Sequence, residues 1–90
     1  MLEGSIKVTN PLGLHARAAA QLVKLANTFS SKIIVKRLDN NVEADANSIL
    51  GLLALAASTG TTLHLRVEGE DEQQAFDAVE SIFKMGFGEI

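Results

Sequence analysis

The 90-residue sequence lacks several side chains on which many functional sites depend: it has no Cys, Trp or Tyr, and only one Pro. Without Cys there can be no disulfide, thiolate metal site or cysteine nucleophile. Aromatic residues make up only 4% of the chain, which argues against the base-stacking surfaces that bind nucleic acid. The net charge of −3, with no long run of Lys or Arg, argues equally against nucleic acid or an anionic membrane surface as a partner.

The sequence also has no long hydrophobic run. Its longest apolar stretch, from Ile49 to Ala57, is about half the length that a membrane-spanning helix requires. Residues Met1 to Lys7 show no apolar segment after a basic start, so we expect neither a secretory signal nor membrane insertion. The absence of Cys suits a reducing compartment, and we therefore expect a cytoplasmic protein.

The length allows one domain, residues 1–90, and the hydrophobic patterns predict its elements. Alternating or β-branched segments predict strands over residues 5–10, 32–38, 42–46 and 62–68. Helical spacing predicts helices over residues 15–29, from Ser48 to before Ser58, and from Asp71 to Phe83, with Ser48 and Asp71 as N-caps. Residues from Gly86 onward are expected to fray. The order βαββαβα indicates an α+β fold in which helices cover one face of a four-stranded sheet.

Residues 13–17 hold the best candidate for chemistry, because they place His15 at the start of the first helix. The backbone N–H groups of Ala16 and Arg17 have no acceptor within the helix, and the helix dipole adds positive charge there. Arg17 contributes a guanidinium whose fork geometry suits phosphate oxygens. The combination predicts an anion-binding site beside an imidazole.

Two mechanisms use such a site. His15 could act as an acid or base beside a bound anion, or it could be a nucleophile that itself accepts a phosphoryl group. The second fits better, because a small domain of helices on a sheet has little room for the pocket and second catalytic group of an acid–base enzyme. A carrier needs neither, since its partners bring the rest of the chemistry.

The segment Gly13-Leu14-His15-Ala16-Arg17-Ala18-Ala19 closely resembles the active-site motif of the HPr family, the histidine-containing phosphocarriers of the bacterial phosphoenolpyruvate-dependent sugar phosphotransferase system (PTS). The resemblance extends over essentially the whole chain, including the segments at 48–55 and 69–73. It implies an open-faced β-sandwich with an antiparallel sheet and three helices on one side. It also implies that His15 accepts phosphate on Nδ1 from phosphorylated enzyme I and passes it to an enzyme IIA domain, with Arg17 stabilising the phosphate.

A second motif begins at Ser48, which we expect to cap a short helix. The resemblance implies that an HPr kinase/phosphorylase could phosphorylate this serine, which would alter a surface that partners contact. Ile49, Leu50 and Leu53 are expected to be partly exposed on this helix, and the resemblance implies that they dock on enzyme I and enzyme IIA. Leu52 and Leu55 are expected in the core.

The chain departs from the family pattern at two positions near His15. Ala18 stands where the family usually has Pro, which would preset the backbone of the first helical turn. Leu12 replaces a small or polar residue. Only Arg17 and Lys24 supply positive charge for steering toward a partner. The other histidine, His64, is expected on the outer face of the sheet as a plain surface residue with no carboxylate at ligand spacing.

These observations predict a monomeric phosphocarrier with no cofactor and no metal site, rather than a self-contained enzyme. One alternative is a regulatory HPr-like protein that acts through Ser48 phosphorylation and a transcription regulator. Another is a carrier of the nitrogen-related PTS branch. The presence of both His15 and Arg17 argues against the purely regulatory alternative.

Overall fold

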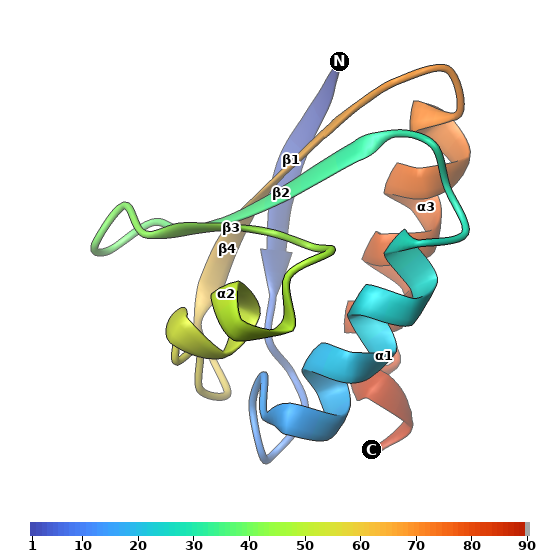
Figure 1. Ribbon diagram of the computed structural model, residues 1–90. Coiled ribbons are helices and arrows are strands. Elements are labelled where there is room, and N and C mark those ends of the chain that lie inside the picture. Colours follow the sequence, from blue (N-terminus) through green and yellow to red (C-terminus); the bar gives the residue numbers. More distant parts are fainter. Residues whose placement is uncertain (90) are drawn as a thin grey trace.

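The computed structural model describes residues 1–89 and contains one four-stranded sheet with its helices on one face (Figure 1). The elements follow the predicted order βαββαβα, with a short 3₁₀ helix added at the end. The strands are β1 (Leu2–Lys7), β2 (Lys32–Arg37), β3 (Glu43–Asp45) and β4 (Thr62–Glu68). The helices are α1 (Ala16–Ala26), α2 (Ile49–Ala54), α3 (Glu72–Lys84) and the 3₁₀ helix η1 (Gly86–Gly88).

The sheet order is β1-β4-β2-β3, and every neighbouring pair is antiparallel. Side chains alternate between the two faces of the sheet along β4. Leu63, Leu65 and Val67 are fully buried on the face that covers the core, whereas the residues between them point to the outer face. The buried face packs against Leu22 of α1 and Val79 of α3 in a single hydrophobic cluster. The expected α+β fold and antiparallel sheet are therefore confirmed.

The boundaries of β1, α1 and α2 differ most from the sequence prediction. β1 begins and ends earlier than residues 5–10, although Val8 still bonds to the segment before β4 through its N–H and C=O groups, at 2.9 and 2.8 Å. Helix α1 ends at Ala26 rather than residue 29, and Thr28 turns its hydroxyl back onto the carbonyl of Leu25, at 2.7 Å. Helix α2 ends at Ala54, because Ala56 adopts a left-handed backbone with φ 50°.

Asp71 is the N-cap residue of α3, as predicted, but its side chain does not cap the helix. The carboxylate instead accepts hydrogen bonds from the backbone N–H groups of Ser30 and Ser31, at 2.9 and 3.0 Å, and from the Ser31 hydroxyl. The Glu72 carboxylate accepts the hydrogen bond at this helix start, from the Gly69 N–H at 3.2 Å. Asp71 thus ties the start of α3 to the segment before β2, a contact between distant residues that no local pattern indicates.

The prediction of a frayed end is wrong. Residues Gly86–Gly88 form η1, and Phe87 is buried with its ring packed edge-on against Phe83, at 4.9 Å between centroids. His64 does lie on the outer face, but it has the carboxylate partner that the sequence did not suggest: Glu3 of β1 lies 2.8 Å from its Nε2. Across residues 1–89, no helix is long and apolar enough to cross a membrane.

Candidate functional site

A tight turn between β1 and α1 positions His15. The Asn10 side chain donates to the carbonyl of Gly13 at 2.7 Å, and the Gly13 N–H donates to the carbonyl of Asn10 at 3.1 Å. Gly13 has φ +68°, a conformation that favours glycine. The N–H of Leu14 then donates to the carbonyl of Ala57 at 2.8 Å, which joins the turn to the segment after α2. The turn is therefore held from two sides immediately before His15.

His15 is the N-cap residue of α1, with extended backbone angles, but its side chain makes no cap bond. The ring is therefore free to contact other groups, and it remains 24% exposed. Its Nε2 lies 2.5 Å from a carboxylate oxygen of Glu89, the last residue that the structure describes. The other ring nitrogen, Nδ1, has no hydrogen-bond partner within the described part of the chain.

Glu89 is the site residue that the sequence prediction missed. Its second carboxylate oxygen accepts a hydrogen bond from Asn10 at 3.2 Å. The hydrogen bond with His15, followed by the one from Asn10, holds the pKa of Glu89 below its ordinary value, and the charges of His15 and Arg17 act in the same direction. The carboxylate is therefore charged at neutral pH. A sequence separation of 74 residues hides this pair, since no spacing rule connects His15 with the tail.

The first turn of α1 offers backbone donors beside the ring that have no acceptor among residues 1–89. The first intrahelical bond of this turn runs from the N–H of Ala19 to the carbonyl of His15, so the N–H groups of Ala16, Arg17 and Ala18 lie ahead of the helical ladder. Arg17 is exposed and forms no ion pair with any residue among 1–89. Ala18 is fully buried, in a turn that tolerates the usual Pro of the motif because its N–H needs no helical acceptor. The turn can hold an oxyanion.

Helix α2 presents the second predicted surface. Ser48 is its N-cap and accepts a hydrogen bond from the Gly51 N–H at 3.0 Å, as predicted. Ile49, Leu50 and Leu53 are 40%, 77% and 37% exposed, so the expected apolar surface exists; we call these three residues the α2 patch. Leu52 and Leu55 are buried, also as predicted.

Contacts between helices bring the α2 patch to the same end of the molecule as the start of α1. Helices α1 and α2 pack against each other, and Figure 1 shows α2 beside the first turns of α1. Lys24 is exposed in the last turn of α1, at the other end of that helix. Arg37 holds the C-terminal end of α2 by donating to the carbonyls of Leu55 and Ala56 at 2.9 and 3.0 Å.

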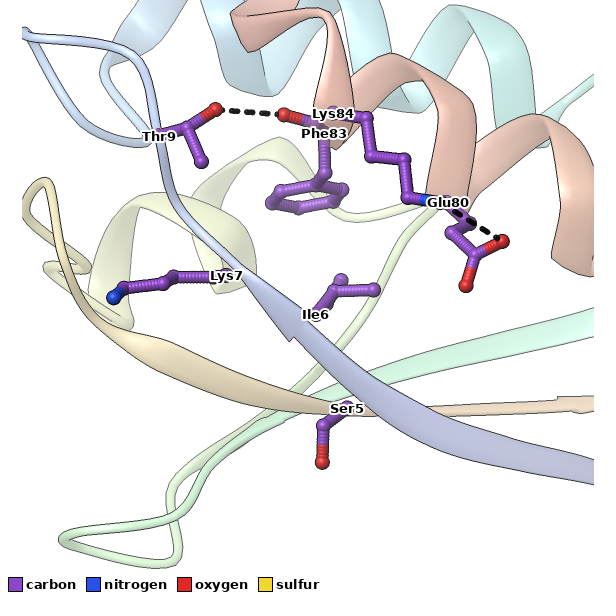
Figure 2. Close-up of a pocket in the computed structure, with 7 residues that line it drawn as sticks. All are labelled: Ser5, Ile6, Lys7, Thr9, Glu80, Phe83 and Lys84. Atoms are coloured by element: carbon purple, nitrogen blue, oxygen red, sulfur yellow. Dashed lines mark hydrogen bonds and ion pairs between the residues drawn. The ribbon is translucent and has the colours of Figure 1, made fainter.

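His15 does not line the cleft drawn in Figure 2. The cleft in Figure 2 lies between β1 and α3, measures about 180 Å³ and contains no histidine. A hydrogen bond from the Thr9 hydroxyl to the carbonyl of Phe83, at 3.0 Å, lies at one side of this cleft. Among residues 1–89, no group of three or more His, Asp or Glu side chains could hold a metal ion. The chemistry available at His15 is therefore that of one partly exposed ring beside a turn that can hold an oxyanion.

Comparison with known proteins decides the family. A family model described as the PTS HPr component phosphorylation site matches residues 2–85. The chain belongs to the HPr family. As a phosphocarrier of the PTS, it carries phosphoryl groups and is not a self-contained enzyme.

Individual relatives agree over nearly the full length. The phosphocarrier protein HPr of Cupriavidus necator is 44% identical over 89 residues, which cover 99% of this chain and 98% of that protein. The phosphocarrier protein NPr of Escherichia coli is 35% identical over 85 residues, covering 94% and 93%. A crystal structure of HPr from Thermoanaerobacter tengcongensis has a TM-score of 0.93 at 40% identity and covers 100% of this chain and 99% of that one. The HPr fold is thus shown by both sequence and structure.

Proposed function

We propose that this HPr-family phosphocarrier takes its phosphoryl group on Nδ1 of His15. The donor is phosphorylated enzyme I, charged from phosphoenolpyruvate, and the acceptor is an enzyme IIA domain. The observation that carries the proposal is the position of the ring. It is partly exposed beside a helix start whose first N–H groups lie ahead of the helical ladder, and Arg17 in the same turn has no ion-pair partner among residues 1–89. Both partners are cytoplasmic in this scheme, and the carrier works as a monomer.

The step itself needs little from the carrier. The electron pair of Nδ1 attacks phosphorus, the N–P bond forms, and the bond between phosphorus and the donor breaks with its electron pair leaving on the donor. The N–H groups of Ala16 and Arg17 and the Arg17 guanidinium face the phosphoryl oxygens and stabilise their charge. Transfer to enzyme IIA reverses these roles.

Partner docking is assigned to the α2 patch. Lys24, which is exposed in the last turn of α1, would add a positive contact away from the patch, at the opposite end of that helix from His15. An exposed side chain such as Leu50, at 77%, gains most from being covered by an apolar partner surface. The same patch serves successive partners, because each must reach the ring of His15 from the side where α2 packs beside α1.

Regulation at Ser48 is the finer part of the proposal. The hydroxyl caps α2 and is exposed, so an HPr kinase/phosphorylase can reach it. A phosphate there sits well at a helix start but places a dianion next to Ile49 and Leu50 of the docking patch. Ser48→Asp should slow phosphoryl transfer from enzyme I more than Ser48→Ala does, and equal rates would remove the regulatory part.

A carrier in the nitrogen-related branch is the second candidate. The 35% identity to the NPr protein of Escherichia coli supports it, although the 44% identity to an HPr favours the sugar branch. Transfer rates to an enzyme IIA domain from each branch would distinguish the two.

The decisive experiment is intact-mass analysis after incubation with phosphoenolpyruvate and a bacterial enzyme I. We expect an acid-labile, base-stable phosphoryl adduct on the parent protein, and none on His15→Ala. His64→Ala is the matched control, because it removes the other histidine, which also contacts a glutamate, and should keep the adduct. An adduct that persists in His15→Ala, or no adduct on the parent with its cognate enzyme I, would exclude His15 as the carrier residue. If the parent forms no adduct with its cognate enzyme I, the regulatory alternative, in which the protein acts through a transcription regulator, becomes the leading hypothesis.

A further inference from the structure

We propose that Glu89 is a positioning residue for His15, whose carboxylate fixes the proton on Nε2 and so leaves the electron pair on Nδ1. The inference rests on the proposed role of His15 as phosphoryl acceptor and explains which of its two nitrogens reacts.

The contact between Glu89 and His15 dictates the tautomer. A charged carboxylate can only accept hydrogen bonds, so the nitrogen that faces it at 2.5 Å must carry a proton. In a neutral imidazole the other nitrogen then holds the free electron pair. Because its pKa lies below the ordinary value, Glu89 remains charged across the range in which the neutral ring reacts. Nδ1 is thereby the nucleophile before any partner arrives.

Asn10 holds the carboxylate in place. Its Nδ2 donates both to Glu89 and to the carbonyl of Gly13, whereas its buried Oδ1 has no partner among the described residues. Turning the amide over would place Oδ1 against two acceptors, so the observed orientation is the favourable one. The side chain that shapes the turn before His15 therefore also orients the group that contacts the ring.

The backbone conformation of residues 86–88 places Glu89 beside the His15 ring. Gly86, Phe87 and Gly88 all have positive φ, at 56°, 54° and 78°, which reverses the chain after α3. A left-handed conformation costs a residue such as Phe87 roughly 1 kcal/mol, and burial of its ring offsets that cost. The N–H of Glu89 donates to the carbonyl of Gly86 at 2.9 Å. The carboxylate is thus carried by an ordered segment anchored in the core.

The arrangement keeps one proton in place through the whole transfer. When the Nδ1 pair forms the N–P bond and the donor leaves, the ring becomes positively charged with its proton still on Nε2. The Glu89 carboxylate offsets that charge. When the phosphoryl group moves to the next acceptor, the electron pair of the N–P bond returns to Nδ1 and the ring is neutral again. No proton has to enter or leave Nε2 in either step.

The test measures the tautomer directly, by long-range ¹H–¹⁵N correlation spectra of the His15 ring at a pH where the ring is neutral. We expect the parent to show the proton on Nε2, and Glu89→Ala to show a mixture of both tautomers. Glu89→Gln keeps an acceptor oxygen but loses the charge, so it should fall between them. Glu3→Gln is the matched control, since it alters the other histidine–glutamate pair and should leave His15 unchanged.

Reactivity is measured with inorganic phosphoramidate, a phosphoryl donor that needs no docking surface. Losing a charge-assisted hydrogen bond to the ring should slow phosphorylation of Nδ1 in Glu89→Ala about tenfold, with phosphate appearing on Nε2 as well. A ring tautomer unchanged in Glu89→Ala would overturn the proposal, and so would a slower reaction without any change of tautomer. If the parent takes no phosphate from enzyme I, the carrier role of His15 fails, whereas the tautomer spectra still decide the role of Glu89.

Discussion

Gly13 offers the sharpest test of how the turn before His15 is built. In Gly13→Ala, the new Cβ would lie 2.6 Å from the carbonyl oxygen of Ala57 and 2.9 Å from the Cα of Ser58. Both are backbone atoms, so neither can rotate away as a side chain could. The turn and the segment after α2 would have to separate, which breaks the 2.8 Å hydrogen bond from the Leu14 N–H to Ala57.

The expected cost has two parts. A non-glycine residue at φ +68° costs roughly 1–2 kcal/mol. Loss of the hydrogen bond adds about 1–2 kcal/mol, because the groups that it joins become unsatisfied. The sum of about 3 kcal/mol should lower the melting temperature of a domain this size by about 12–24 °C.

Gly60→Ala separates the two parts. Gly60 also has a left-handed φ, +90°, but a Cβ there would meet nothing within 4 Å. It should therefore show only the conformational cost, about 1–2 kcal/mol. Thermal unfolding followed by far-UV circular dichroism measures both variants, since the chain has no Trp or Tyr for fluorescence. Equal losses of stability in the two variants would refute the argument that the turn is held tightly against Ala57.

Three further predictions concern residues that connect elements. The pKa of Asp71 is held below its ordinary 3.8, first by the hydrogen bond from the Ser31 hydroxyl. The charged carboxylate therefore stabilises the fold above pH 3.8, and this stabilisation is lost as the pH falls through the lowered pKa. Asp71→Asn should melt at a lower temperature than the parent at neutral pH, and the difference in melting temperature should shrink in acid. Ala18→Pro should raise the free energy of unfolding by about 0.4–1 kcal/mol, as measured in urea, because its N–H lies ahead of the helical ladder. Arg37→Ala should cost about 2 kcal/mol and speed amide exchange of Leu55, since the carbonyls at the end of α2 lose a charged donor.

The sequence predicted correctly the features that depend only on residues close together in the chain. The strand predicted over residues 62–68 coincides with β4, because strict alternation of Leu63, Leu65 and Val67 leaves one possible face for the core. Ser48 was also predicted correctly, because an N-cap bonds to an amide only three residues along the chain, here that of Gly51. Both signals are contained within the segment that they describe.

The contacts that the sequence did not reveal join residues far apart. Asp71 could either cap α3 or reach Ser31, and only the packing of α3 against the sheet decides between them. The pair of Glu3 and His64 depends on the register of β1 against β4, which alternation alone leaves open. The sequence of the tail is ambiguous. Phe87 lies between two glycines, and this pattern fits a turn that buries the Phe ring as well as it fits a frayed end.

The same long-range contacts make His15 part of a larger unit. One hydrogen bond, from Leu14 to Ala57, links the turn before the ring to the end of α2, and Arg37 holds the neighbouring carbonyls. A partner that binds the α2 patch therefore contacts a helix whose following segment, at Ala57, is hydrogen-bonded to the turn that carries His15. From the other side, Glu89 contacts the ring, and Asn10 holds the Glu89 carboxylate. These hydrogen bonds connect the docking helix to the turn that carries His15. A variant that loosens the Ala57 segment should therefore impair phosphoryl transfer from a protein donor even though it removes no group that contacts phosphate.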